Sequence, residues 1–450
     1  MSRRIKWAAS LLLPLLILLV PVSESFTAQM RLFFVVTLIV IAVMAFELTP
    51  MIVPSLAFPL LYIITGLAVP KVAFSTWLTV NPWMLIGGLI MANILNGTGL
   101  LKRGAYWGVI KSGATYHGIL YALLIAGMVC NLFIPGQALI PMALITYSVC
   151  QALGLEKSRE SSGIMLAGFF GATIPMYFFF SSHFVMFQSV GMSVADVSVS
   201  WLGYLFHNLP VVPWAFFVVF MVSRLLKAEK EINGKVFFQK ELEGMGPMTS
   251  REKRAVVVCI ALVLCLVTNS LHNIQPAWIL MLFVCISFLP GINIGNKESV
   301  EQVNWAFVFL SAGCMAIGEV SNALGVGTWL SSMLVPFMSR CGNTMVLVCA
   351  WLLAFVMNFL MSPLAIAATF SAPLTRLAMD LSINPLMLYY SMIQGADQIL
   401  LPYEWPYFMV FFSFGLITMR DFFKIYSMKL AASFLFFILV MVPWWNLIQI

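Results

Sequence analysis

Four interruptions break otherwise apolar stretches of the sequence, and they contain the residues best able to bind a solute. The interruptions lie at 130–137, 180–183, 361–364 and 402–407. Where a helix is broken at membrane depth, its free carbonyl groups can bind cations and the N–H groups of helix N-termini can bind anions. Proline explains the break in three of the four segments, because it removes a helix hydrogen bond and clashes with the preceding turn. The pattern predicts a binding site made from unwound backbone and the polar side chains beside it.

Three polar side chains in these segments have suitable chemistry. Asn131 can donate and accept hydrogen bonds, which suits an ion or a carboxylate. Glu404 is expected to line a cavity, to pair or to be protonated, since an ionised carboxylate at the bilayer centre costs about 2.5–3.5 kcal/mol. Asp397 and Gln398 can share that cavity, and the alternative for Glu404 is a structural hydrogen bond that closes the broken helix. His183 can titrate near neutral pH, although a lone histidine more often donates one structural hydrogen bond.

The composition indicates a membrane protein. Of the 450 residues, 62% are hydrophobic and 9% are charged, with a mean hydropathy of +0.99, whereas ordinary globular domains carry about 25% charged residues. The apolar runs exclude a soluble enzyme and predict an all-α polytopic membrane protein, because in lipid the backbone must satisfy its own hydrogen bonds. The eight cysteines lack metal-binding or disulfide spacing, so free thiols are expected. The net charge of +7 is attributed to membrane topology rather than to a nucleic-acid partner.

The order of apolar segments predicts about 11 transmembrane helices and two re-entrant hairpins in an inverted repeat. Residues 1–29 contain the first transmembrane helix, which we expect to be retained rather than cleaved as a signal peptide. Repeat 1 covers 30–223 with an inner hairpin at 118–153, and repeat 2 covers 255–450 with an outer hairpin at 344–380. The expected spans lie near 7–22, 30–49, 51–69, 82–97, 163–192, 201–223, 255–271, 275–290, 303–319, 386–415 and 428–448.

A charged segment at 224–254 joins the two repeats. It holds eight basic and five acidic residues and is expected to be a solvated cytoplasmic linker. With both hairpins re-entrant, 20 of the 24 Lys and Arg residues fall on the cytoplasmic side, Lys429 among them. This bias predicts a multi-pass protein of the cell (inner or plasma) membrane, with a cytoplasmic N-terminus and an extracytoplasmic C-terminus.

A short internal motif favours the inverted repeat. Three residues recur at the same spacing in the two halves: Gly87, Asn96 and Gly99 in the first, and Gly313, Asn322 and Gly325 in the second. Each set closes an expected span and opens an amphipathic segment, at 100–111 and at 326–338. The shared spacing and the matching order of spans together predict two halves of opposite orientation.

The chain resembles the divalent anion:sodium symporter family, which contains sodium-coupled di- and tricarboxylate and sulfate transporters. The linker residues 241–253 are similar to that family's L-x-x-x-G-P-x-x-x-x-E-K segment. Residues 47–50 resemble its T-E-x-x-P motif, and 304–325 resemble its W…GG…GL stretch. The similarity covers about 30–440 and is clear in patches.

This resemblance implies a homodimer in which a transport domain moves against a scaffold domain as an elevator. In the family, a Ser-Asn-Thr motif at each hairpin tip binds sodium and the substrate carboxylate. The matching positions here are 130–132 and 362–364, where only Asn131 and Ser362 keep the family's residue type. The resemblance implies Na⁺ sites at Cys130, Asn131 and Ser362, and the chain is expected to be a diverged member without intact motifs.

The main hypothesis is a secondary active transporter, an elevator-type symporter or exchanger for an anion such as a di- or tricarboxylate or sulfate. Its partners are the anionic substrate, Na⁺ or H⁺, and membrane lipid, with no cofactor beyond a coupling Na⁺. Glu404 would carry the coupling proton or help to hold a cation. The residues expected to contact substrate are Asn131, Gln137, Ser181, Ser182, His183, Ser362 and Glu404.

The sequence also leaves other functions open. A degenerate relative acting as a channel or as a regulatory membrane protein remains open, because several ion ligands of the family are absent. A proton-coupled carrier of a more apolar substrate is a further alternative, since Trp405 and Tyr407 give the last break an aromatic character. An enzyme is not expected, because the sequence has no H-E-x-x-H motif and no histidine-rich cluster.

Overall fold

The computed structural model describes most of the chain, and all regular secondary structure in the described residues is helical. The described residues are 3–45, 48–50, 52–134, 136–181, 184, 199–228, 234–303, 305–326, 329, 332, 342–359, 363–400, 404 and 406–450.

The first half and the linker contain the following helices: α1 (Arg3–Leu15), η1 (Leu16–Leu19), α2 (Ala28–Ala45), α3 (Ile52–Ile64), α4 (Pro70–Ala73), η2 (Ser75–Leu78), α5 (Val80–Thr98), α6 (Leu100–Lys111), α7 (Tyr116–Phe133), α8 (Leu139–Ala152), α9 (Arg159–Thr173), η3 (Ile174–Tyr177), α11 (Trp201–His207), α12 (Val211–Leu225) and α13 (Lys235–Gly244). The second half contains α14 (Ser250–Val267), α15 (Asn269–His272), α16 (Pro276–Ser287), α17 (Lys297–Glu301), α18 (Trp305–Ala323), α20 (Asn343–Met357), α21 (Pro363–Asp380), α22 (Pro385–Ala396), α23 (Pro406–Ser413), α24 (Met419–Phe436), η5 (Phe437–Met441) and α25 (Val442–Leu447).

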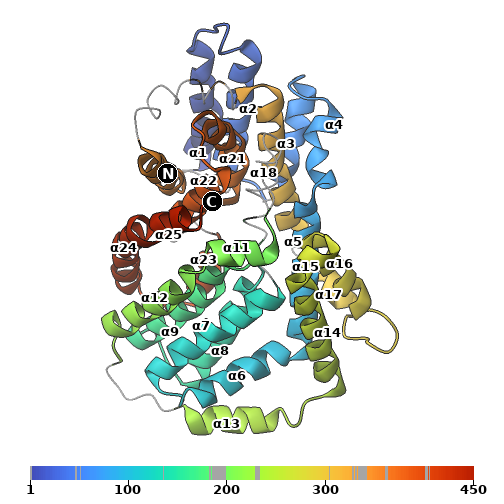
Figure 1. Cartoon of the computed structure of the whole chain (residues 1–450), viewed down its shortest axis with the longest axis vertical. Coiled ribbons are helices and arrows are strands. Elements are labelled where there is room, and N and C mark those ends of the chain that lie inside the picture. Colours follow the sequence, from blue (N-terminus) through green and yellow to red (C-terminus); the bar gives the residue numbers. More distant parts are fainter. Residues whose placement is uncertain are drawn as a thin grey trace.

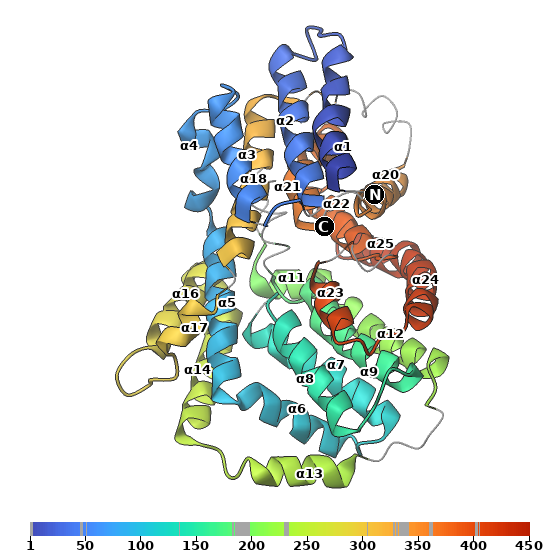
Figure 2. The ribbon, with the colours of Figure 1, turned by 180° about the vertical axis from the view of Figure 1, so that it is seen from behind.

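Each half has one central helix that two other helices cover. In the first half, α9 is buried along nearly its whole length and packs against both α7 and α8. In the second half, α22 is equally buried and packs against α20 and α21. The α7–α9 group and the α20–α22 group lie at different levels of the molecule, with α5 and α14 running along one side (Figure 1). The view from behind shows α23, from the second half, beside α8 of the first (Figure 2).

Two further pairs of helices pack reciprocally across the two halves. Helix α5 packs on α16, and α18 packs on α3. The repeated glycines stand at these contacts: a Cβ at Gly87 would lie 3.0 Å from Met281 Sδ of α16, and a Cβ at Gly313 would lie 2.3 Å from the carbonyl oxygen of Ser55 in α3. The glycines therefore permit close helix packing at equivalent places in the two halves.

The second glycine of each repeated motif ends its helix in the same way. Gly99 (φ +80°) lies between α5 and α6, and Gly325 (φ +74°) follows α18. This left-handed conformation costs little for glycine because it has no Cβ. After Gly99 the chain turns by 66° into α6, as the amphipathic segment at 100–111 predicts.

Membrane-spanning length is clear for only part of the described chain. Two helical stretches are long and apolar enough to cross a membrane, Tyr116–Phe133 and Met419–Leu447, and two bent pairs would raise this number to four. One bent pair is α11 and α12, where the single span expected at 201–223 is divided by a 56° bend. Among the described residues the helix count of about 11 spans therefore stays a prediction.

The last helical stretch differs from its prediction at a charged residue. The expected span began at residue 428 and left Lys429 at the cytoplasmic end, but the helical stretch begins at Met419. Lys429 consequently lies well inside α24, and it is 1% exposed. Lys429 is therefore buried and paired with a carboxylate rather than exposed at the flank of a span, and its side of the membrane stays a prediction.

The linker is more structured than a solvated loop. It contains α13, which packs on α6 through contacts that include the Tyr106 and Phe238 rings (Figure 1). The next helix, α14, begins with a capping box in which Thr249 and Glu252 exchange hydrogen bonds with each other's backbone N–H groups. The hydrophobic side of α13 explains why this charged segment packs against α6.

Candidate substrate and ion sites

The break between α7 and α8 is held by one amide side chain. Asn131 Nδ2 donates to the carbonyl oxygens of Gly127 at 3.0 Å and of Ala172 at 2.9 Å, and Oδ1 accepts from the Gly136 N–H at 3.3 Å. The side chain thus ties the tip of the hairpin to the end of the central helix α9. Both Nδ2 hydrogens are used, so its remaining capacity is one lone pair on Oδ1, which suits a cation better than a carboxylate.

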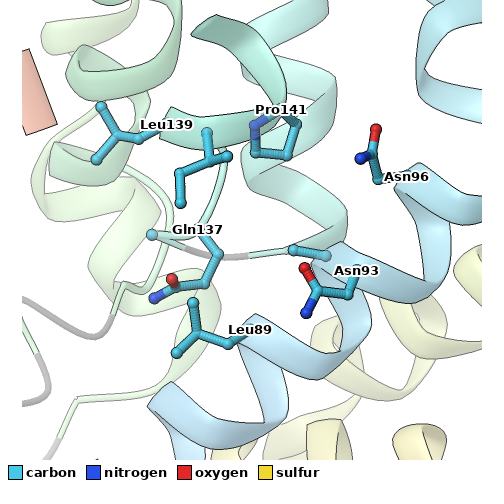
Figure 3. A pocket seen from close by; sticks show the side chains of 9 residues that line it. Leu89, Asn93, Asn96, Gln137, Leu139 and Pro141 are labelled. Carbon is cyan, nitrogen blue, oxygen red and sulfur yellow. The ribbon is translucent and has the colours of Figure 1, made fainter. Parts of the chain in front are cut away.

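A pocket opens between the tip of this hairpin and α5. It is lined by Leu89, Ala92, Asn93, Asn96, Gly136, Gln137, Leu139, Ile140 and Pro141, and contains about 420 Å³ of empty space, part of it open to solvent. Asn93 and Asn96 follow one another along α5, opposite the segment that carries Gln137 (Figure 3). Asn93 Nδ2 donates to the Ser299 carbonyl at 3.0 Å.

The other two amides in this pocket have no hydrogen-bond partner among the described residues. They belong to Gln137, which is buried, and to Asn96, which is exposed. The position of the Gln137 side chain also requires a glycine at residue 88, since a Cβ there would lie 2.7 Å from Gln137 Cγ. The pocket can therefore offer uncharged N–H donors and carbonyl acceptors to a small polar solute.

Glu404 lies in the break between α22 and α23. Its carboxylate is buried and accepts from the Leu400 N–H at 3.3 and 3.2 Å, and from Asn358 Nδ2 at 3.4 Å. Asn358, which directly follows α20, also donates to the Gln398 carbonyl at 3.3 Å. These bonds join the unwound segment after α22 to the end of α20.

A buried ion pair lies next to this break. Lys429 Nζ is 2.5 Å from Asp397 Oδ2, and Tyr177 OH donates to Asp397 Oδ1 at 2.8 Å. The sequence indicated that Asp397 can share the cavity of Glu404, but it did not single out Lys429 or Tyr177. The sequence signal that could have indicated this pair was a lysine close to one long apolar run and an aspartate inside a second apolar run.

The other predicted site residues are only partly described. Ser181 Oγ donates to the Met176 carbonyl at 3.1 Å. Cys130 is a buried free thiol, and its carbonyl accepts from the Ile134 N–H. Ser182, His183 and Ser362 lie outside the described residues. The structure therefore places Cys130, Asn131 and Gln137 at one hairpin, and Ser181 and Glu404 at two other breaks.

The described residues contain no group of three or more His, Cys, Asp or Glu side chains that could hold a metal ion. Sodium prefers oxygen ligands. The candidate side-chain ligand next to Cys130 is the oxygen atom Asn131 Oδ1. The Na⁺ sites implied by the resemblance stay predictions.

Comparison with known proteins identifies the family. The sequence model described as "Sodium:sulfate symporter transmembrane region" matches residues 2–450. The chain belongs to this family. The resemblance to divalent anion:sodium symporters is thereby confirmed, and since the family consists of transporters, the chain is not an enzyme.

Individual relatives are distant. An L-tartrate/succinate antiporter of Escherichia coli is 21% identical over 365 residues, which are 76% of this chain and 74% of that protein. A protein of Cupriavidus necator, described as a membrane protein, is 23% identical over 283 residues. That match covers 61% of this chain, and the chain spans about half, 55%, of that relative's length.

A solved structure supports the all-helical transporter fold. The YdaH transporter of Alcanivorax borkumensis aligns with a TM-score of 0.56, covering 86% of each chain at 13% sequence identity. At this identity the similarity concerns the fold alone.

Proposed function

We propose that this protein is a secondary active carrier of a small anion of the di- or tricarboxylate or sulfate class in the cell membrane. Transport is driven by Na⁺ or H⁺, or by exchange for a second anion, as in the relative named an L-tartrate/succinate antiporter. The observation that carries the proposal is the amide-lined pocket between the α7–α8 tip and α5.

The chemistry of this pocket suits an oxyanion. Gln137 and Asn96 supply amide groups without partners among the described residues, and amide N–H groups hydrogen-bond to carboxylate and sulfate oxygens. Asn131 maintains the hairpin tip and keeps one Oδ1 lone pair for a cation. In this proposal Ser181, Ser182, His183, Ser362 and Glu404 contact the substrate or the coupling ion from the other breaks.

The position of the pocket favours an elevator movement. Its two sides belong to different packing groups: α5 packs on α16, whereas the α7–α8 hairpin packs on α9. Sliding the hairpin and α9 past α5 would close the pocket on one side and reopen it on the other. The reciprocal pairs α5–α16 and α18–α3 support the inverted repeat that such a movement uses, and the homodimer follows from the family resemblance.

The test is counterflow of labelled succinate, tartrate and sulfate in proteoliposomes, with a thermal-shift screen of the same anions with and without Na⁺. A bound anion raises apparent stability by mass action. Gln137→Ala should raise KM about tenfold or more, the effect of losing one hydrogen bond to a charged group. Gln239→Ala, on the exposed side of α13, is the matched control. Absence of counterflow and of any thermal shift with all three anions would contradict the proposal.

A further inference from the structure

Lys429 lies in a cage of oxygen atoms at the end of α22. Its Nζ is 2.5 Å from Asp397 Oδ2, 3.2 Å from the Asp397 carbonyl oxygen and 3.5 Å from Gln398 Oε1. Asp397 is the C-cap of α22, where the helix dipole also favours a positive charge. The rings of Phe170 and Tyr426 lie 5.9 and 5.8 Å from Nζ. Among the described residues, Lys429 is the only buried Lys or Arg.

The carboxylate in this cage links the two halves. Asp397 Oδ1 accepts from Tyr177 OH of η3, which follows α9, while Oδ2 accepts from Lys429 of α24. Both carboxylate oxygens thus have a donor, so the pair is held where the broken helices of the two halves meet. A lone buried ammonium would be strongly unfavourable, and the pairing makes the site neutral.

A pocket reaches the carboxylate. It contains about 320 Å³ of empty space, part of it open to solvent, and its lining residues are Ile174, Tyr177, Val211, Trp214, Gln394, Asp397, Gln398, Ser433 and Phe436. Two lining atoms, Gln394 Nε2 and Ser433 Oγ, are buried and have no hydrogen-bond partner within the part of the chain that the structure describes, and Ser433 is 5% exposed. Unpaired buried polar atoms are uncommon, and here they stand beside the ion pair where a polar ligand would satisfy them.

We propose that Asp397 and Lys429 form the coupling site of the carrier, in which the Lys429 ammonium permanently occupies the place of a coupling cation and Asp397 accepts the coupling proton. This inference rests on the proposed anion transport. Cages of carboxylate, carbonyl and amide oxygens are typical alkali-cation sites, but this cage already contains a positive charge that would repel Na⁺.

The coupling step involves only one proton. When H⁺ binds Asp397 Oδ2, the carboxylate becomes a neutral carboxylic acid and the pair changes from net zero to +1. Lys429 then lacks a counter-charge and attracts an anionic group into the pocket beside Asp397, a second subsite whose lining residues are distinct from those of the amide-lined pocket at the α7–α8 tip. Loss of the proton restores the ion pair and releases the anion, so each binding event favours the other.

Other titratable groups near Asp397 do not replace it in this role. Those around it in the described chain are Tyr177 from η3, Lys429 and Tyr426 from α24, and Glu404 from the following break. The lining residues from α12, Val211 and Trp214, are not titratable. Glu404 accepts hydrogen bonds from the Leu400 N–H and from Asn358 Nδ2, which hold its carboxylate at the break.

The experiment uses the full chain in proteoliposomes and separates exchange from coupling. In wild type, an inward-directed pH gradient should drive succinate accumulation, a pH dye should report proton entry with the anion, and replacing Na⁺ by K⁺ should change nothing. The double variant Asp397→Asn/Lys429→Met removes both charges, so it leaves no stranded ammonium. It should show succinate counterflow with a KM raised about tenfold or more and a flat pH profile, and lose about tenfold or more of the pH-driven accumulation.

The control is Glu301→Gln, which removes the acid of the exposed Lys297–Glu301 pair and should behave as wild type. A strict Na⁺ requirement in wild type, or full pH-driven accumulation and an unchanged pH profile in the double variant, overturns the coupling proposal while counterflow still supports a carrier. Absence of counterflow in wild type with succinate, tartrate and sulfate overturns the transport function itself.

Discussion

Arg103 and Glu252 form a two-bond contact between helices that are 149 residues apart in the sequence. Arg103 Nε donates to Glu252 Oε1 at 2.7 Å and an Nη donates to Oε2 at 3.3 Å. The same guanidinium donates to the carbonyl oxygens of Met245 and Gly246, so it fixes the end of the linker as well. The corner between α6, the linker and α14 is thus built on one arginine.

The first prediction concerns this corner. Arg103→Ala should lower the free energy of unfolding by about 2 kcal/mol, because it leaves a buried carboxylate without its charged donor. Thermal unfolding in detergent measures the change. Lys297→Ala, which breaks an exposed pair, should change stability by less than about 1 kcal/mol. Equal effects from the two variants would contradict the assigned role of Arg103.

The second prediction is a pH dependence at Glu252, which lies before the span expected at 255–271. Burial alone would raise the pKa of Glu252, but hydrogen bonds from Arg103 and Thr249 and the Arg103 charge outweigh it and hold this pKa below its usual value. The resulting stabilisation is present above the unfolded pKa of about 4.3 and is lost as pH falls through the lowered folded pKa. Unfolding curves of wild type should converge with those of Glu252→Gln on acidification. A gap that stays constant down to the acid limit argues against this linkage.

The third prediction compares the repeated glycines. Gly313→Ala should destabilise the protein by about 1–3 kcal/mol, because its Cβ would overlap a backbone oxygen of α3 that cannot move alone. Gly87→Ala should cost less, since its nearest neighbour is the flexible Met281 side chain. Gly104→Ala, which meets nothing within 4 Å in α6, should stabilise by about 0.5–1 kcal/mol. Thermal unfolding of the three variants checks this order, and the reverse order would refute the packing argument.

The fourth prediction concerns the hairpin tip. Asn131→Asp should be strongly destabilising and should abolish counterflow, because a carboxylate would replace a donor that faces the Gly127 and Ala172 carbonyls. Asn446→Asp changes the same atoms at an exposed position of α25 and serves as the control. Near-normal stability of Asn131→Asp would show that the tip does not depend on these two bonds.

Local features were predictable from the sequence where local physics decides them. Gly99 ends an apolar stretch and must adopt a left-handed conformation, so the corner between α5 and α6 follows from the chain itself. The break near Asn131 was predictable from Pro135, four residues later, because proline interrupts the helix hydrogen bonds. The Asn131 partner in α9, 41 residues away, could not be deduced because it depends on how the hairpin packs.

The buried ion pair shows the limit of sequence reasoning most clearly. A lysine within a few residues of an apolar run has the same local pattern whether it flanks a membrane or enters the core. Lys429 is buried in the core because it pairs with Asp397, which lies 32 residues earlier at the end of another helix. The local sequence does not contain this information. The positive-inside rule therefore counted Lys429 with the flanking charges.

The Asp397–Lys429 pair also bears on the electrical behaviour of the empty protein. A cation that is part of the chain cannot dissociate, and its charge is cancelled by the neighbouring carboxylate. In the proposed elevator movement, the segment that holds the pair would change its depth in the bilayer without work against the membrane voltage, whereas moving one unpaired elementary charge across takes about 2.3 kcal/mol per 100 mV.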